Sequence, residues 1–372
     1  MIKKLLFSLL ILISFNGLSQ NIALSENAKA SILTCGLGPE SYAMYGHTGI
    51  RIQDSIQNLD VVYNYGAFDF STPNFIGRFI KGDLQYFVTN GTFVDFYFNY
   101  QAENREIIEQ ELALSPSQIN NLFQQLNQSV YSDERYYTYK FIDRNCTTMV
   151  VDKINGILGK EYIKSETSKL SYREILYPYM TDFYMKLGIQ LIFGAKVDQP
   201  ATRLFLPYEF EKAISKTKVN NAFLEKTNKT ILQVTKPEVP FNWLNSIYSL
   251  ITVLLILAIL NKKWIKFSYF IFAGLLGLFF SLVGLYSLHE EILWNYNILL
   301  FNPLLLVFAW YIKKGIKDKI LLFGKIILAM LLVYLAYMTT KIHLGIVWPF
   351  IVLHFYWIGK IVLQIKKSST AR

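Results

Sequence analysis

The sequence predicts an exported α+β domain followed by an all-α bundle of five transmembrane helices. Three observations carry this prediction: an apolar leader, a middle part in which strand and helix patterns alternate at globular density, and five apolar runs in the last third. The 372 residues are 52% hydrophobic and 16% aromatic but only 17% charged, which is too apolar for a typical soluble enzyme. Part of the chain is therefore expected to lie in lipid.

The N-terminus has the features of a secretory signal peptide. Two lysines precede an apolar run at 5–15, and residues 17–19 supply a small-x-small cleavage pattern. We therefore assign residues 1–19 to a signal peptide that is cleaved near Gln20. The alternative is an uncleaved anchor, for which the run is short. Either interpretation exports the domain that begins at about residue 20.

Three further segments complete the expected organisation. Residues 20–236 form the exported domain, 237–242 form a linker that begins at Pro237, and 243–372 form the transmembrane domain. Each apolar run of the transmembrane domain approaches or exceeds the ~20 residues needed to cross a bilayer. The expected helices are 243–260, 264–288, 292–312, 320–338 and 344–363.

The net charge of +10 is explained by membrane orientation and gives no reason to expect a nucleic-acid partner. Basic residues cluster in alternate loops, which places those loops in the cytoplasm, the N-terminal domain outside and the C-terminus inside. The cytoplasmic cations are expected to be Lys262, Lys263, Lys266, Lys313, Lys314, Lys317, Lys319, Lys366, Lys367 and Arg372.

Periodicity predicts the main elements of the exported domain. Residues 42–52 and 60–65 read as adjacent strands, and 84–89 and 92–100 read as a hairpin around the turn dipeptide Asn90-Gly91. A capping box at 115–118 begins an amphipathic helix. Residues 136–142 read as a strand, and a helix then begins at Cys146 and ends at Gly159.

Cys146 and His47 are the residues that best suit nucleophilic chemistry. His47 is the only histidine of the exported domain, and Cys146 lies at the start of a helix, where backbone N–H groups and the helix dipole stabilise a thiolate. The same N–H groups can hold the oxyanion that forms during attack on an acyl carbonyl. The alternative is a structural Cys146, buried or in a disulfide with Cys35, the other exported cysteine.

A third group should orient His47 through its far ring nitrogen. The next strand offers Asn64 and Asp60, and sequence does not fix the register; we favour Asn64. In the membrane part, His289, Glu290 and Glu291 follow the second run. These three are interpreted either as a lipid-headgroup or acceptor site or as an ordinary interfacial belt.

Several motifs resemble a known family. The pattern Tyr-x-His-x-Gly-Ile with a later Asn-Cys at a helix start resembles the permuted papain-like, NlpC-type core of lecithin retinol acyltransferase. More closely, over residues 25–235, the chain resembles the exported domain of the Lnb-type lipoprotein N-acyltransferases of Gram-negative bacteria. The segments that carry this resemblance are Leu33-Thr-Cys-Gly-Leu-Gly-Pro-Glu, Tyr45-Gly-His-Thr-Gly-Ile-Arg, Val62-Tyr-Asn-Tyr-Gly-Ala-Phe-Asp-Phe and Asp143-Arg-Asn-Cys-Thr-Thr.

The resemblance implies a function. It implies a permuted papain-like catalytic domain in the periplasm, anchored in the bacterial inner membrane. It further implies transfer of an acyl chain from a phospholipid, through a thioester on Cys146 with His47 as base and acid, to the N-terminal amine of a lipoprotein. No metal or organic cofactor is expected. The rivals are a tethered cysteine peptidase or amidase acting on cell-wall peptides, and a non-catalytic scaffold that binds lipid or lipoprotein.

Overall fold

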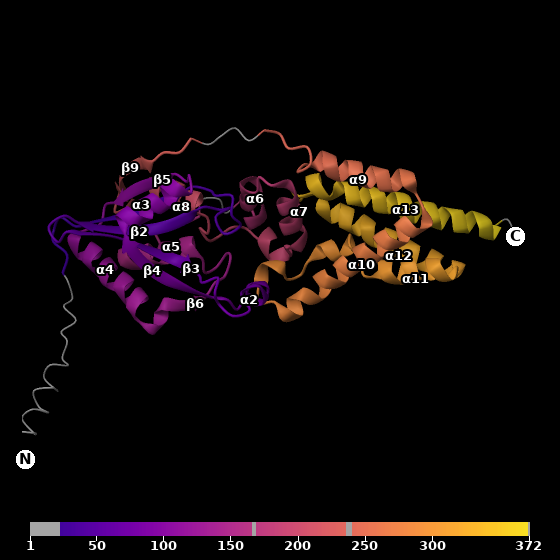
Figure 1. The fold of residues 1–372 in the computed structure, drawn as a ribbon, viewed down its shortest axis with the longest axis horizontal. Helices are drawn as coiled ribbons and strands as arrows, with labels where there is room; N and C mark the ends of the chain where they lie inside the picture. Colours follow the sequence, from indigo (N-terminus) through magenta and orange to yellow (C-terminus); the bar gives the residue numbers. More distant parts are fainter. Residues whose placement is uncertain (1–22, 166–168, 236–239, 371–372) are drawn as a thin grey trace, which may run out of the picture.

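A computed structural model describes residues 23–165, 169–235 and 240–370. The expected signal peptide, 1–19, lies outside the described residues, as does part of the expected linker. Figure 1 shows an elongated molecule with a β-sheet domain at one end and a helical bundle at the other. We call the described residues up to 235 the sheet domain and those from 240 the bundle.

The sheet domain is built on an antiparallel sheet of seven strands in the order β6-β4-β3-β2-β1-β5-β9. Its strands are β1 (Lys29–Cys35), β2 (His47–Asp54), β3 (Leu59–Ala67), β4 (Gln85–Thr92), β5 (Ile107–Leu112), β6 (Tyr136–Thr138) and β9 (Glu225–Leu232). A two-stranded ribbon, β7 (Lys218–Val219) and β8 (Ala222–Phe223), precedes β9. The expected strands 42–52 and 60–65 overlap β2 and β3, which lie side by side, but residues 42–46 precede β2 and 42–45 form a turn.

Helices cover both faces of this sheet because successive strand residues point to opposite sides. Ile32 belongs to the large core shared with α4, α5 and α8, whereas Leu33 packs in a second core with α3. The capping box at Ser115 is confirmed at the start of α4. The helices of this domain are α2 (Phe75–Lys81), α3 (Phe93–Ala102), α4 (Pro116–Tyr131), α5 (Cys146–Leu158) and α8 (Pro207–Lys216).

The hairpin expected around Asn90-Gly91 is wrong. Strand β4 continues through this dipeptide to Thr92, since Asn90 pairs with Tyr63 of β3. Thr92 then caps α3 by accepting a hydrogen bond from the Asp95 N–H. Pairing with a longer neighbouring strand thus overrides the local turn preference, and the aromatic segment that follows is helical.

The bundle contains α9 (Ile247–Leu260), α10 (Lys263–Tyr286), α11 (Leu304–Lys314), α12 (Lys317–Met338) and α13 (Leu344–Thr370). Within the described ranges, four segments are long and apolar enough to cross a membrane. They are Lys263–Tyr286, Glu290–Lys314, Lys317–Met338 and Leu344–Lys367. Helix α9 has only 14 residues, and 3-10 turns at Glu290–Ile292 and Tyr296–Leu299 interrupt the second of the four segments.

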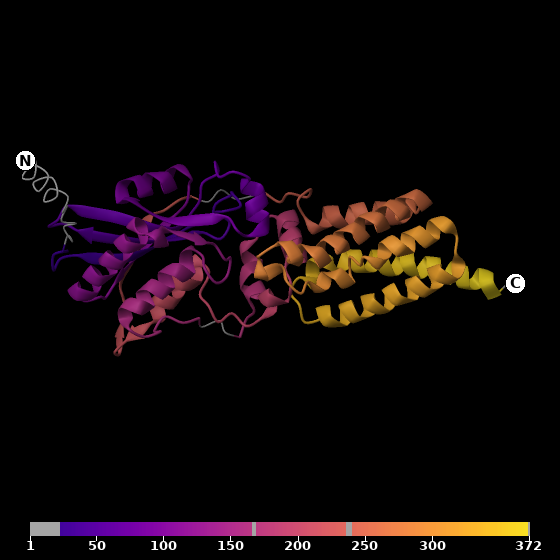
Figure 2. The same ribbon diagram turned by 90° about the horizontal axis from the view of Figure 1, so that it is seen from below.

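Two short helices, α6 (Tyr172–Leu176) and α7 (Phe183–Ile192), join the sheet domain to the bundle (Figures 1 and 2). Leu187 and Leu191 of α7 pack in the core of the bundle itself. Gly194, which follows α7, donates its N–H to the Glu291 carbonyl at 2.7 Å. The two parts of the molecule are therefore packed together over a continuous interface.

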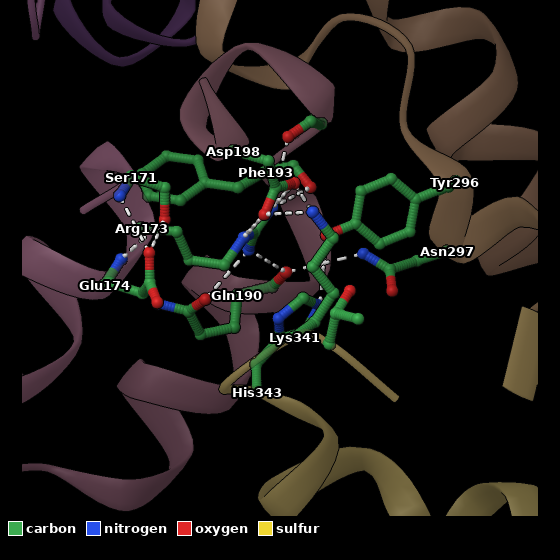
Figure 3. A network of polar contacts seen from close by, with 12 residues as sticks. Ser171, Arg173, Glu174, Gln190, Phe193, Asp198, Tyr296, Asn297, Lys341 and His343 are labelled. Carbon is green, nitrogen blue, oxygen red and sulfur yellow. Dashed lines mark hydrogen bonds and ion pairs between the residues drawn. The ribbon is translucent and has the colours of Figure 1, made fainter. Parts of the chain in front are cut away.

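A buried arginine lies at the centre of this interface (Figure 3). The Arg173 side chain is 1% exposed and donates to Asp198 at 3.0 Å and to the Gln190 side chain at 2.8 Å. Tyr296, from the bundle, donates its hydroxyl to the same Asp198 carboxylate at 2.8 Å. One buried carboxylate thus binds the sheet domain and the bundle together.

The structure confirms a mixed α/β sheet domain followed by a helical region with candidate membrane spans.

Candidate functional site

Cys146 is the first residue of α5, and the helix ends at Gly159 as expected. Asn145 caps the helix: its side-chain oxygen accepts the N–H groups of Thr147 and Thr148, both at 2.9 Å. These two donors were expected to be available to an oxyanion, but the cap occupies them. In the first turn of α5, the backbone N–H that Asn145 does not bind is that of Cys146 itself.

The strand expected at 136–142 is shorter in the structure. It ends at Thr138, and a turn closed by the backbone pair Lys140 and Arg144 leads to the cap residue Asn145. The nucleophile candidate therefore follows a turn and not a strand. The Asn145 amide N–H₂ holds this turn by donating to the carbonyls of Phe141 at 2.7 Å and Phe205 at 2.9 Å.

The register of β2 and β3 brings His47 and Asn64 together. His47 begins β2, Asn64 pairs with Gly49, and the His47 Nε2 lies 3.1 Å from the Asn64 Oδ1. Because an amide oxygen only accepts, Nε2 carries a hydrogen, and Nδ1 is the ring nitrogen left to interact with Cys146. Asp60, the alternative third group, instead forms a salt bridge with Arg51 at 2.6 Å.

The environment of Cys146 favours the thiolate. Burial would raise its pKa, but hydrogen bonds and the charge of His47 oppose that effect. His47 and the Thr48 backbone N–H are the groups that most stabilise the charged sulfur, and the Thr147 hydroxyl lies 3.9 Å from it. The pKa of Cys146 is lowered as a result, which is the state that a nucleophilic cysteine requires.

The thiol pKa of Cys35 is shifted in the opposite direction. Cys35 is the last residue of β1 and is buried. It is paired with His47 in the backbone register of β1 and β2. Burial raises the pKa of its thiol to about 12, although a hydrogen bond with Tyr100 opposes the shift. Both cysteines are free thiols, so the disulfide considered for Cys146 does not form in this structure.

Sequence reasoning missed part of the site. Three further residues contact the nucleophile or its helix: Asn145, Thr48 and Thr147. The polar run Asn-Cys-Thr-Thr was the sequence signal that could have indicated Asn145 and Thr147. Gly66, at the end of β3, has φ +94°, and a Cβ there would lie 3.6 Å from the Cys146 Cβ. A glycine is therefore needed where β3 passes the nucleophile.

The polar segment after α10 contacts the sheet domain. His289 Nε2 donates to a backbone carbonyl of α2 at 2.8 Å, and Glu290 forms an ion pair with Lys196 at 2.6 Å. Glu291 accepts the Ile142 N–H at 3.4 Å. Neither sequence interpretation, headgroup site or interfacial belt, anticipated these contacts.

Among the described residues, no group of three His, Cys, Asp or Glu side chains is arranged to hold a metal ion.

Comparison with known families agrees with this architecture. Residues 18–178 match the family model of the Lnb N-terminal periplasmic domain, and residues 228–368 match that of the Lnb transmembrane domain. No curated protein and no solved structure matches the chain. The two family matches follow each other in order and together span most of the sequence, so the chain belongs to the Lnb-type family, with a periplasmic N-terminal domain and a membrane-embedded C-terminal domain.

Proposed function

We propose that this protein is a lipoprotein N-acyltransferase that works through a cysteine thioester. The observation that carries the proposal is the arrangement of three groups in a domain packed directly against the bundle: His47 lowers the pKa of Cys146, and Asn64 lies 3.1 Å from the His47 Nε2. A lowered thiol pKa, a base and an orienting amide are the parts of a Cys-His nucleophile. We further propose that the sheet domain has permuted papain-like topology.

The first half-reaction transfers the acyl chain to the enzyme. The Cys146 thiolate attacks the ester carbonyl of a phospholipid, and the Cys146 N–H faces the resulting oxyanion. The S–C bond forms, the ester C–O bond breaks, and protonated His47 gives its proton to the departing lysophospholipid oxygen. Asn64 keeps the imidazole oriented by accepting from Nε2, which leaves Nδ1 to carry the transferred proton.

The second half-reaction delivers the acyl chain to an amine. The neutral N-terminal amine of a diacylated lipoprotein attacks the thioester and loses one proton to His47. The N–C bond forms, the S–C bond breaks, and the thiolate and imidazolium are restored. Transfer in place of hydrolysis requires water to be excluded while the amine is held within attack distance. A site beside the bilayer suits both requirements, because donor and acceptor are lipids.

The membrane arrangement belongs to the same proposal. We propose that α9 is a fifth crossing: its 14 residues span about 21 Å, which is short for a ~30 Å hydrocarbon core, and Trp243 before it adds an interfacial anchor. The basic loops and the C-terminus then lie on the cytoplasmic side of a bacterial inner membrane. A reporter fused after Arg372 should behave as cytoplasmic; an active alkaline-phosphatase fusion there would refute the five-crossing topology.

Intact-mass spectrometry with defined substrates tests the reaction. Protein given phospholipid alone should gain a hydroxylamine-sensitive acyl group at Cys146, and the Cys146→Ser variant should not. A diacylglyceryl lipopeptide with a free N-terminus should discharge the adduct and gain one acyl chain. A lipopeptide with a blocked amine should leave the adduct in place.

Other outcomes identify the rival functions. Release of free fatty acid at one rate with and without the acceptor would identify a lipase. Cleavage of a cell-wall peptide without an adduct from phospholipid would identify the peptidase. The matched control is Cys35→Ser, which should form the adduct, because the Cys35 thiol is buried and has a raised pKa.

A further inference from the structure

Helix α2 presents an apolar face to the outside of the molecule. Ile76, Phe79 and Ile80, at helical spacing, are 72%, 51% and 49% exposed, and none of the helix's residues is fully buried. Phe70, in the loop before the helix, is 67% exposed. Contiguous exposed apolar side chains mark a surface that contacts another apolar phase. We call these four residues the α2 patch.

The position of α2 indicates which phase that is. Figure 2 shows α2 lying crosswise to the long axis of the bundle, beside the junction. Three groups that follow α10 bind carbonyls at the end of α2: the Leu288 N–H at 2.6 Å, the Ser287 hydroxyl at 2.9 Å and His289 Nε2 at 2.8 Å. Since α10 is a candidate span, α2 lies at the level where that span leaves the membrane.

The patch is also continuous with the lipid-facing surface of the bundle. Leu285 and Tyr286, the last residues of α10, are 84% and 58% exposed and come directly before the residues that hold α2. Arg78, on the exposed part of α2, provides a cation suited to phospholipid phosphates. Apolar side chains beside a basic one are typical of a helix that lies in the membrane interface.

A row of aromatic rings leads from α2 toward the nucleophile. Successive ring centroids are separated by 6.5, 5.1 and 4.9 Å along Phe79, Phe75, Phe70 and Phe68. Phe68 is two residues beyond Gly66, the glycine beside Cys146. The row therefore runs from the exposed face of α2 to within two residues of Gly66.

We propose that the α2 patch lies among the acyl chains of the periplasmic leaflet, and that the aromatic row guides the donor acyl chain from the leaflet to Cys146. The first part stands on the position and exposure of α2 alone. The second part rests on the proposed function, because it assumes that an acyl chain reaches the nucleophile.

Fluorescence quenching tests the first part without any activity. Ile76→Cys, made in the Cys146→Ser protein and labelled with an environment-sensitive dye, is reconstituted into phosphatidylcholine vesicles with or without brominated acyl chains. The matched control is Ile56→Cys, which is 65% exposed in the turn between β2 and β3, at the opposite end of the sheet. Brominated lipid should quench the label at 76 and not at 56. No quenching at 76, or equal quenching at both positions, would overturn the membrane contact.

A charge substitution tests the second part. Phe70→Glu, at a position shared by the α2 patch and the aromatic row, should slow adduct formation from vesicle phospholipid about tenfold or more, since a phenylalanine that lipid covers contributes about 1.5–3 kcal/mol. A soluble short-chain phospholipid should restore the rate, and Ile56→Glu should behave as wild type. Equal slowing with both donors would refute the path. If wild-type protein forms no adduct, the proposed function fails, while the quenching result still decides the membrane contact.

Discussion

Removing the His47 imidazole should make Cys146 much less reactive. In the intact site, burial raises the thiol pKa and the hydrogen bond and charge of His47 lower it, with a net downward result. A hydrogen bond to a charged group contributes about 1.5–3 kcal/mol, and each 1.36 kcal/mol changes an ionisation equilibrium tenfold, so His47→Ala should reduce the ratio of thiolate to thiol at Cys146 about 10- to 150-fold at a given pH. The thiolate of the wild type is present above its lowered pKa and is lost as the pH falls through it; in the variant this loss moves to higher pH.

The rate of iodoacetamide alkylation against pH measures this change, with mass spectrometry of the modified peptide to identify the site. Cys35 is an internal control, because its thiol has a pKa of about 12 and is buried. It should react only after unfolding. Asn64→Ala keeps the imidazole but removes the acceptor 3.1 Å from Nε2, so its effect should be smaller than that of His47→Ala.

Two results would refute this reasoning. A His47→Ala protein that is alkylated at the wild-type rate across the pH range would mean that the imidazole does not stabilise the thiolate. Faster alkylation of Cys35 than of Cys146 in the folded protein would mean that the two thiols have been assigned to the wrong environments.

Three substitutions test other parts of the structure. Gly66→Ala places a Cβ at φ +94°, 3.6 Å from the Cys146 Cβ, so it should slow adduct formation and destabilise the fold by about 1–3 kcal/mol, as read from activity and a thermal melt together. Arg173→Met removes the buried partner of Asp198, which keeps an ion pair with Lys341 at 3.4 Å, and it leaves the Gln190 side-chain oxygen without the Arg173 donor; it should cost about 3–5 kcal/mol, seen as a lower melting temperature in detergent. Lys196→Ala removes partly exposed ion pairs and should cost about 1 kcal/mol or less. Equal destabilisation by the last two variants would contradict the importance assigned to burial.

Local signals predicted the elements that begin or end with their own cap residues. The Ser115 capping box and the helix from Cys146 to Gly159 are of this kind, since both depend on residues within one or two turns. The β2 and β3 pair was also correct, because alternation of apolar side chains reports a half-buried strand. Its register, which places Asn64 at His47, depends on pairing that the sequence pattern leaves open.

Elements decided by distant partners could not be read in this way. The Asn90-Gly91 dipeptide favours a turn locally, yet β3 pairs with it and keeps the strand extended. Asn145 lies between the expected strand at 136–142 and the expected helix from Cys146, and sequence reasoning assigned its side chain no role. In the structure it caps α5 and donates to the carbonyls of Phe141 and Phe205. The contacts of Glu291 join residues about 150 positions apart, for which no sequence spacing gives a signal.

If the proposed function holds, the place where the bundle binds the sheet domain limits the distance between a lipid ester in the membrane and Cys146. Lys140 donates to the Leu288 carbonyl at 2.7 Å and Ile142 donates to Glu291, so the turn before the nucleophile rests on the segment that follows a candidate span. Ile142 and Cys146 are separated by four peptide units, which reach at most about 14 Å when extended. The Cα of Cys146 thus lies within about that distance of the Cα of Ile142, the residue that contacts the end of the bundle. An ester in the membrane interface can reach Cys146 while most of its acyl chain stays in the bilayer, whereas an enzyme acting on cell-wall peptides gains nothing from this placement.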